Sequence, residues 1–366
     1  MSSPTPAEGA ARRPLRYGWT TGACATAASK AAYQALLTGA FPDPVTIRLP
    51  KGRIHSFALA RKSLHADFAE AGVVKDAGDD PDVTHGALVL ARVRHGPPGS
   101  GVVFRAGQGV GTVTKPGLPI PPGEPAINPV PREMMRQAIR EVAEAHGGSG
   151  DTVLEISIPG GEALAQKTWN PRLGIVNGLS ILGTTGIVVP YSCAAWIHAI
   201  HRGIDVARAL GHAHVAGSVG ATSEGLVRAL YGLPETALID MGDFVGGMLK
   251  YLRRHPVRRL TIAGGFAKMS KLAQGHLDLH SGRSQVDKAF LAALLRDSGA
   301  GPDLVSCAEA ANTGLEVLQL ARRHGIPLAD RIAREARETA RRALAGTEID
   351  LDVLVSDREG RLIGRA

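Results

Sequence analysis

Residues 213–220 read Ala-His-Val-Ala-Gly-Ser-Val-Gly, a short apolar run followed by a turn that carries two glycines. The next stretch, residues 223–231, is predicted to be a helix, and Asp240 ends a second apolar run at residues 237–240. A strand, a glycine turn, a helix and another strand in this order predict a parallel βαβ unit. Glycines let the backbone approach a ligand closely, and a carboxylate at the tip of the second strand accepts hydrogen bonds from ribose hydroxyls. The pattern therefore predicts a site for an adenosine cofactor.

The glycine turn is a weak motif when taken alone. Gly217, Ser218 and Gly220 do not complete the G-x-G-x-x-G pattern of dinucleotide sites, so a tight structural turn with a surface aspartate stays open as the alternative. A second pair, Gly264-Gly265, follows the apolar run at residues 260–263. In a parallel sheet both turns fall at the carboxyl ends of strands, where open α/β folds bind ligands. Their convergence favours a cofactor site.

The C-terminal half continues this alternation of short apolar runs and helices. Further helices are expected on both sides of the second glycine pair, and a hairpin closes the chain. We therefore predict a Rossmann-like α/β domain at residues 201–366. Its expected helices are residues 244–254, 285–295, 304–311, 314–323 and 330–345, and its expected hairpin strands are residues 349–355 and 361–363.

The N-terminal half has a different pattern. Thr20-Thr21-Gly22 opens an alanine-rich run to Leu37, which predicts a closely packed helix capped by a threonine. Pro131 is the expected first residue of a second helix that ends near His146. These features predict an α+β domain with a mainly antiparallel sheet at residues 15–200, after a flexible tail at residues 1–14, and an α/β fold class for the whole chain. The expected strands are residues 45–49, 57–64, 88–93, 102–104 and 151–158.

The composition limits the class of partner. The 42 lysines and arginines exceed the 34 aspartates and glutamates, which leaves a net charge of +8 and favours an anionic partner. Aromatic residues make up only 4% and are not interleaved with lysines, so nucleic acid is not expected.

Residues 173–197 carry no charge, but their glycines and Pro190 argue against a membrane span. Three distant cysteines and an N-terminus without an apolar core predict a cytoplasmic protein.

Several catalytic arrangements are missing from the sequence. It has no G-x-S-x-G motif, no Walker lysine loop and no paired catalytic carboxylates, which disfavours hydrolases and kinases. His276 and His280 are spaced like a metal-binding pair, but no third ligand is evident, so no metal site is predicted. Lys268 and Lys271 fit either a ligand site or an exposed helix face.

Residues 167–186 mix cations, an amide and hydroxyls with apolar residues and glycines. Polar groups in an apolar setting need partners, and a ligand carboxylate is a natural one. The alternative is a set of turn residues that bond to one another. The candidate ligand-binding residues are Lys167, Asn170, Arg172, Thr184 and Thr185.

Three motifs occur together in this chain. Residues 17–24 read Tyr-Gly-Trp-Thr-Thr-Gly-Ala-Cys; Thr-Val-Thr-Lys-Pro-Gly-Leu at 112–118 is followed by Glu-Pro-Ala-Ile-Asn-Pro-Val-Pro-Arg; and Asn-Pro-Arg-Leu-Gly-Ile at 170–175 precedes Gly-Thr-Thr-Gly-Ile-Val. Over roughly residues 17–281 the sequence resembles the cobalt-precorrin-5B C-1 methyltransferase family of the anaerobic cobalamin pathway. The resemblance implies transfer of a methyl group from S-adenosylmethionine to carbon C-1 of a cobalt-corrinoid substrate, which yields cobalt-precorrin-6A.

Together with the glycine turn and the loop motifs, the resemblance leads us to assign roles to residues of both predicted domains. A corrinoid with many acidic side chains matches a basic protein, and methyl transfer from a sulfonium needs alignment more than acid–base catalysis. S-Adenosylmethionine is expected at Gly217, Ser218, Gly220, Asp240 and Asp243, with His280 as the expected catalytic group near the reacting ring. The expected substrate-binding residues are Thr20, Thr21, Lys115, Arg132, Lys167, Asn170, Arg172, Thr184 and Thr185.

Two other functions stay open at this point. A nicotinamide-dependent reductase of a tetrapyrrole intermediate would use the same glycine turn, and a non-catalytic basic module would bind RNA with a steep salt dependence. The expected partner is a small cobalt-corrinoid molecule rather than nucleic acid or a membrane. A homo-oligomer is compatible with the sequence.

Overall fold

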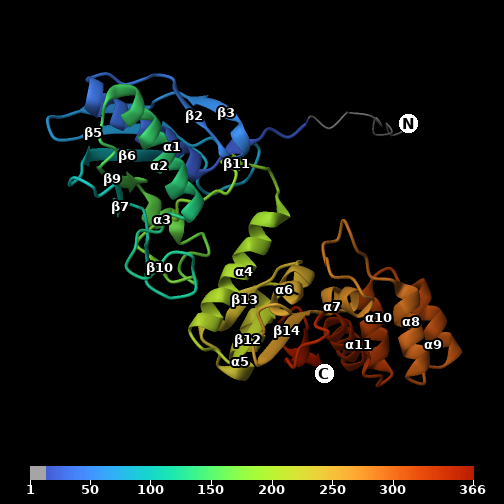
Figure 1. Cartoon of the computed structure of the whole chain (residues 1–366). Coiled ribbons are helices and arrows are strands. Elements are labelled where there is room, and N and C mark those ends of the chain that lie inside the picture. The colour runs from blue at the N-terminus through green and yellow to red at the C-terminus, as the bar shows by residue number, and fades with distance from the viewer. Residues whose placement is uncertain (1–13) are drawn as a thin grey trace, which may run out of the picture. The chain divides into compact units, whose positions relative to one another are not determined.

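The computed structural model describes residues 14–366, which form two compact units. The first unit comprises the described residues up to Thr114 together with Pro119–Ser192, and the second comprises Lys115–Leu118 together with Cys193–Ala366. Each unit has its own sheet and its own apolar core (Figure 1). The tail expected at residues 1–14 lies outside the described residues, except for Pro14.

The first unit is built on a five-stranded sheet with the order β4-β5-β6-β9-β7. Neighbouring strands are antiparallel except β9 and β7, which are parallel. Side chains along β9 alternate between buried and half-buried, which fits a strand with one face against the core. The strands are β4 (Arg61–Leu64), β5 (Ala69–Val74), β6 (Leu88–His95), β7 (Val102–Ala106) and β9 (Thr152–Ser157).

Two long helices pack against each other in this unit (Figure 1), and the first of them also packs on β5 and β6. Helix α1 (Thr21–Thr38) buries a run of alanines, whose small side chains allow the helix to approach the sheet closely. Its last turn ends at Gly39, which adopts a left-handed conformation with φ of 77°. Helix α2 (Pro129–His146) begins with a proline, which has no amide hydrogen to leave unpaired.

Short strand pairs fix the loops of the first unit. The pairing of β1 with β11 and that of β8 with β10 each join segments that are more than sixty residues apart in the chain. Both pairings lie next to the sequence motifs at residues 17–24 and 170–188. The remaining elements here are β1 (Gly18–Trp19), β2 (Val45–Arg48), η1 (Pro50–Gly52), β3 (Ile54–Phe57), β8 (Thr112–Val113), α3 (Gly161–Ala165), β10 (Ile175–Val176) and β11 (Ile187–Val188).

The second unit contains a five-stranded sheet with the order β13-β12-β14-β15-β16. The first four strands are parallel, and β16 is antiparallel to β15. The expected parallel βαβ unit is therefore confirmed. The strands are β12 (His214–Ser218), β13 (Leu238–Asp240), β14 (Arg259–Gly265), β15 (Asp350–Ser356) and β16 (Leu362–Arg365).

Helices cover both faces of this sheet. On one face α5 packs with Leu226 and Val227 against Ala216 and Ala263. The other face lies under a larger apolar cluster that includes residues of α4, α6, α7 and α11. The helices are α4 (Cys193–Ala209), α5 (Ala221–Tyr231), α6 (Val245–Leu252), α7 (Phe266–Ala273), α8 (Lys288–Asp297), α9 (Pro302–Ala310), α10 (Gly314–Arg323) and α11 (Leu328–Ala343), with η2 (Glu235–Ala237) before β13.

The α/β class is confirmed, but several expected elements differ from those observed. The single strand expected at residues 57–64 is wrong, because the chain leaves β3 at Phe57 and enters β4 only at Arg61. Strand β5 and helix α4 were not expected, α7 was considered only as an alternative for Lys268 and Lys271, and α2 begins two residues before Pro131. The domain limits and domain roles stay predictions. No helix within residues 14–366 combines the length and apolar character needed to cross a membrane.

One charged side chain lies fully inside the first unit. Lys75 is 1% exposed, and its ammonium group donates to a carboxylate oxygen of Asp82 at 2.7 Å. The other oxygen accepts from the amide and the hydroxyl of Thr84 at 2.7 and 2.6 Å. Burial raises the pKa of Asp82, but the ammonium group and these hydrogen bonds outweigh it and hold the pKa below its ordinary value. The carboxylate therefore stabilises the fold above the ordinary aspartate pKa, and this contribution is lost as the pH falls through the lowered pKa.

We expect Asp82→Asn to destabilise the first unit by about 3 kcal/mol at neutral pH, because it leaves a buried ammonium group without its counter-charge. Lys75→Met should cost less, since the Asp82 side chain is 26% exposed and can be hydrated. The double variant should recover part of the loss seen in Asp82→Asn. Urea unfolding of the full chain measures all three, and a loss in Asp82→Asn no larger than that in Lys75→Met would contradict this account.

Candidate functional site

The carboxyl edge of the second unit's sheet contains a topological switch point. Ser218 at the end of β12 lies beside Asp240 of β13 on one side and Ala263 of β14 on the other. The helix that follows β12 is α5 and the helix that follows β14 is α7, and they cover opposite faces of the sheet. Loops that leave two adjacent parallel strands toward opposite faces form the crevice in which open α/β folds bind ligands. Both predicted glycine turns therefore lie at the expected edge.

The glycines of the predicted cofactor turn differ in their surroundings. A Cβ at Gly217 would overlap the sulfur of Met248, so this glycine lies in close contact with the core of the second unit. Gly220 and Gly265 have open space where a Cβ would lie, so a ligand can approach their backbone. The hydroxyl of Ser218 is buried and has no hydrogen-bond partner among the described residues. An unpaired buried hydroxyl is unfavourable, and a ligand at this turn could satisfy it.

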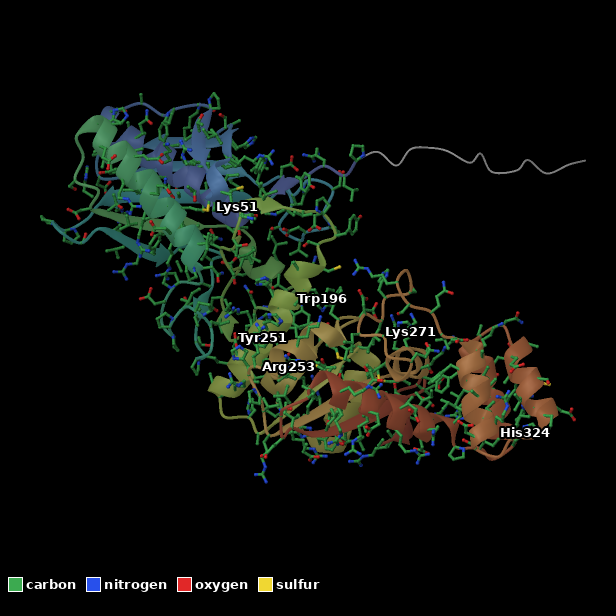
Figure 2. All side chains as sticks on the ribbon, turned by 45° about the vertical axis from the view of Figure 1, so that its right-hand side comes forward. Lys51, Trp196, Tyr251, Arg253, Lys271 and His324 are labelled. Carbon is green, nitrogen blue, oxygen red and sulfur yellow. The ribbon has the colours of Figure 1, made fainter. Side chains whose placement is uncertain are left out.

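Trp196 lies at the turn after β13 (Figure 2), and sequence reasoning did not single it out. Its indole N–H donates to the backbone carbonyl of Asp240 at 3.2 Å, and the side chain is 41% exposed. Gly242, with φ of 52°, places its Cα against the same indole ring. The structure thus brings an exposed aromatic ring to the predicted ribose-binding carboxylate. The signal available in the sequence was weak, because the ring belongs to a helix, α4, that was not expected.

Two lysines of α7 converge on one carbonyl group beside this edge. Lys268 and Lys271 each donate to the carbonyl oxygen of Leu279 at 3.0 Å, and Lys268 also pairs with the carboxylate of Asp243. Lys271 is buried, so the alternative of an exposed helix face is wrong for this residue. Burial lowers the pKa of Lys271, and the positive charge of Lys268 lowers it further. The predicted cofactor residue Asp243 is therefore already held by a cation.

His280 lies on the loop that these lysines hold. Its side chain is exposed, and its Nδ1 accepts a hydrogen bond from the amide of Gly282 at 3.1 Å. Asp278 supports the loop by accepting from the amide of His280 at 3.1 Å and pairing with Arg283 at 2.8 Å. His276 is also exposed. Within the described part of the chain, no group of three or more histidine, cysteine or acidic side chains is placed to hold a metal ion.

In the first unit two of the sequence motifs interlock. Thr20 caps α1 by accepting from the amide of Ala23 at 3.2 Å, and a Cβ at Gly183 would overlap the Thr20 side chain. The hydroxyl of Thr21 accepts from the amide of Leu182 at 3.0 Å and donates to its carbonyl at 3.3 Å. The structure therefore brings Thr20 and Thr21 to the loop that carries the next two predicted residues, which are Thr184 and Thr185. Thr184 is exposed, and Thr185 bonds locally to the backbone of Ile187.

The residues predicted near position 170 divide into bonded and exposed side chains. The amide of Asn170 donates to the carbonyl of Gly178 at 3.0 Å and accepts from the hydroxyl of Ser180 at 3.1 Å, and all of these groups are buried. Asn170 thus closes the turn in which it lies, as the alternative interpretation held. The guanidinium of Arg172 lies 5.8 Å from the ring centroid of Trp169, and Lys167 is exposed.

The last two predicted substrate residues lie in different units. The guanidinium of Arg132 donates to the carbonyls of Ile127 at 2.8 Å and Pro125 at 3.0 Å, and it also contacts the Glu124 carboxylate at 3.2 Å. It therefore holds the loop before α2. Lys115 belongs to the segment Lys115–Leu118 of the second unit, where the backbone of Gly117 lies against Asp205 in α4.

Comparisons with known proteins identify close relatives. The family model described as CbiD matches residues 8–190, and the model described as CbiD, C-terminal domain, matches residues 278–366. A cobalt-precorrin-5B C(1)-methyltransferase of Bradyrhizobium sp. is 66% identical over 96% of this chain and 94% of its own, and one of Paramagnetospirillum magneticum is 64% identical over 96% and 98%.

A solved structure also matches. It is the crystal structure of a cobalamin biosynthesis protein (cbiD) from Archaeoglobus fulgidus, with 24% identity, coverage of 85% of each chain and a TM-score of 0.39. The identity to the curated relatives extends over nearly the whole length of the chain. The chain therefore belongs to the CbiD family of cobalamin biosynthesis, whose curated relatives are named cobalt-precorrin-5B C(1)-methyltransferases.

Proposed function

We propose that this protein transfers the methyl group of S-adenosylmethionine to carbon C-1 of cobalt-precorrin-5B, giving cobalt-precorrin-6A. The observation that carries this proposal is the identity of 60–66%, over 96% of the chain, to proteins named for that methyl transfer. As a member of this family the chain is a methyltransferase of cobalamin biosynthesis. The identity of the methyl donor, the site residues and the reaction product are our inferences.

The second unit offers a fitting place for an adenosine-containing donor. Gly220 and Gly265 leave their backbones accessible at the switch point, and Asp240 ends the neighbouring strand. A carboxylate at this place accepts hydrogen bonds from ribose hydroxyls in related folds, and an exposed indole such as that of Trp196 provides a face on which adenine can stack. These features support donor binding at this edge.

The first unit offers groups that suit an acidic macrocycle. Thr184 and Lys167 are exposed, and both lie in loops whose backbone is fixed by side-chain hydrogen bonds. A corrinoid precursor carries many carboxylates, which a protein with a net charge of +8 attracts. Loops that are already fixed lose little conformational entropy when the substrate binds, so binding is less costly. We assign these loops to substrate binding.

The reaction needs few catalytic groups from the protein. S-Adenosylmethionine would supply an electrophilic methyl group there: the ring carbon would provide the electron pair of the new C–C bond, the pair of the broken S–C bond would stay on sulfur, and the positive charge would pass from the sulfonium to the macrocycle, whose conjugated system would delocalise it. The protein then contributes mainly by aligning the two reacting atoms and excluding water. Such a reaction does not require a protein nucleophile activated by a general base.

The direct test is incubation of the purified protein with cobalt-precorrin-5B and S-adenosylmethionine labelled in its methyl group. We expect one labelled carbon in the product, located at C-1 by mass spectrometry and NMR. A label at another ring carbon, or no transfer with folded protein, would contradict the proposal.

The donor site predicts that Asp240→Asn weakens binding of S-adenosylmethionine by roughly tenfold, because a charged acceptor for the ribose is lost. Asp297→Asn, which changes an exposed aspartate at the end of α8, is the matched control and should bind as the wild type does. Isothermal titration calorimetry measures both. An unchanged affinity in Asp240→Asn would remove this residue from the site.

The substrate loops predict opposite results for two threonines. Thr20→Ala should lower the free energy of unfolding by about 1 kcal/mol, because α1 loses its cap. Thr184→Ala should unfold as the wild type does but raise the KM for the corrinoid about threefold to tenfold, since one exposed hydrogen-bonding group is lost. Urea unfolding and steady-state kinetics separate the two effects, and an unaltered KM in Thr184→Ala would exclude this hydroxyl from substrate binding.

A further inference from the structure

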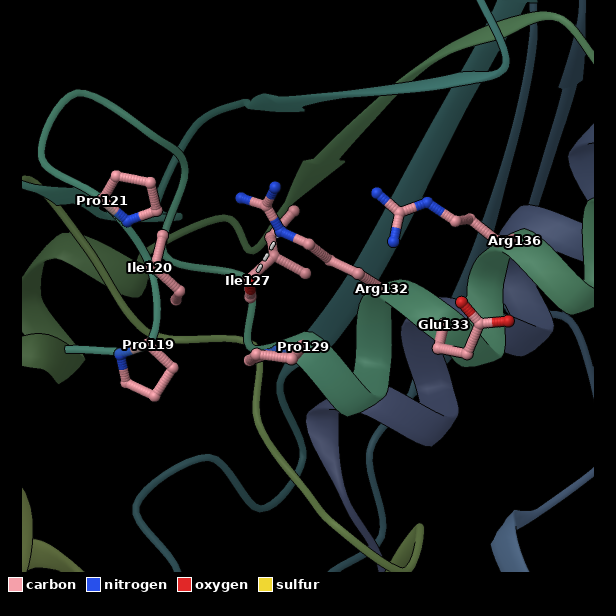
Figure 3. Close-up of a pocket in the computed structure, with 8 residues that line it drawn as sticks. All are labelled: Pro119, Ile120, Pro121, Ile127, Pro129, Arg132, Glu133 and Arg136. Carbon is pink, nitrogen blue, oxygen red and sulfur yellow. Dashed lines mark hydrogen bonds between the residues drawn. The ribbon is translucent and has the colours of Figure 1, made fainter.

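A cavity of about 360 Å³ lies beside the first turns of α2 in the first unit (Figure 3). One wall is apolar, and the other is made by charged side chains of the helix. The volume is near the lower limit of small-molecule sites, so it suits a side chain and the edge of a ring rather than a whole macrocycle. The apolar wall includes Pro119, Ile120, Pro121 and Ile127.

The apolar wall is fixed in place by Arg132. Its guanidinium bonds to the carbonyl of Ile127 (Figure 3) and to that of Pro125, both of which precede the helix, and it contacts the carboxylate of Glu124. Ile127 is fully buried beneath the cavity. Prolines in the wall have no amide hydrogen to donate, and the charged donors at the cavity are on the helix side. Arg132 is a positioning residue for this cavity.

Arg136, one turn further along α2, has a different environment. Its guanidinium carbon lies 5.1 Å from the ring centroid of Phe104, and that of Arg132 lies 5.2 Å from the same centroid. Glu133, the acidic residue at the cavity, is paired with Arg140 at 2.9 Å. Within residues 14–366 no carboxylate pairs with Arg136. The contact with Phe104 orients the guanidinium without neutralising its charge, and its planar fork of donors matches a carboxylate.

We infer that this cavity is a subsite for one peripheral carboxylate of the corrinoid substrate, with Arg136 as the group that binds it. The inference rests on the proposed function for the identity of the substrate. The apolar wall receives the methylene groups and the ring edge next to the carboxylate, and Arg136 pairs with the carboxylate itself. The cavity suits a carboxylate attached to an apolar body. The amino-acid end of S-adenosylmethionine fits it less well, because a positive ammonium group lies beside the carboxylate of that end.

A binding experiment tests the subsite without catalysis. The probes are cobyrinic acid, a cobalt corrinoid with free peripheral carboxylates, and its fully esterified methyl ester. We expect the wild type to bind the acid more tightly than the ester, and Arg136→Met to bind the acid about tenfold more weakly with no change for the ester. Arg136→Lys should restore part of the affinity, since it keeps the charge but not the fork. Equal binding of the acid by the wild type and Arg136→Met would overturn the inference, as would no binding by the wild type.

Arg105→Met is the matched control, because Arg105 is exposed and follows Phe104 on β7, so its side chain points to the opposite face of the sheet. It removes the same charge and should leave binding of the acid unchanged. Urea unfolding of both variants checks that the fold is retained. An equal loss in both variants would assign the effect to net charge and overturn the subsite.

Kinetics provide the second readout. Arg136→Met should raise the KM for the corrinoid about tenfold with little change in kcat and none in the Kd of S-adenosylmethionine. A raised Kd for the donor instead would assign the cavity to the donor's carboxylate and overturn the inference. Absence of methyl transfer in the wild type would contradict the proposed function, whereas the comparison of cobyrinic acid with its ester would still decide the subsite.

Discussion

The hydroxyl of Thr21 bonds both backbone groups of Leu182, which lies 161 residues further along the chain. Beside it the Thr20 side chain rests against Gly183, whose φ of 130° and missing Cβ permit the contact. Pro131 in the first turn of α2 lies against Gly22 on the same side. The start of two helices and one irregular loop are thus fixed at a single place. Every candidate substrate residue of the 181–188 loop depends on this contact, because the loop has little regular secondary structure of its own.

In the second unit, charged side chains hold the loop beside the carboxyl edge of the sheet. Lys268 and Lys271 share the carbonyl of Leu279, and Asp243 neutralises one of the two cations. Two ammonium groups at one acceptor repel each other. The carbonyl oxygen of Leu279 and the carboxylate of Asp243 offset this repulsion, because both place negative charge beside the cations. The loop that carries His280 is consequently tied to α7 and to the turn after β13, where the amide of Leu279 also donates to the carbonyl of Asp243 at 2.9 Å. This constraint also explains why Lys271 has a lowered pKa while it remains hydrogen-bonded.

The parts of the fold that could be predicted from the sequence are those in which local pattern and final environment agree. The run at residues 213–220 predicted a parallel strand and turn correctly. Its apolar residues favour a strand locally and are buried in the sheet, and its glycines lie where the chain leaves that strand. Strand β5 was missed because alanine, glutamate and glycine, which fill its first four positions, have low strand propensity, although the strand is buried over most of its length. The burial of Lys271 and the bonds of Arg132 were also beyond prediction. Their partners are carbonyl groups of irregular loops, and such acceptors carry no signature in the sequence.

The candidate site residues therefore fall into two physical classes. Thr20, Thr21, Asn170 and Arg132 already form side-chain hydrogen bonds within the protein, and these bonds fix the loops in which the residues lie. A reaction that depends on alignment gains from such pairing, because loops fixed before binding lose little further entropy when substrate arrives. Recognition must then fall to groups that the fold orients but leaves without a charged partner. In the first unit Arg136 is such a group, since Phe104 sets its direction while Arg140 keeps the nearby Glu133 occupied.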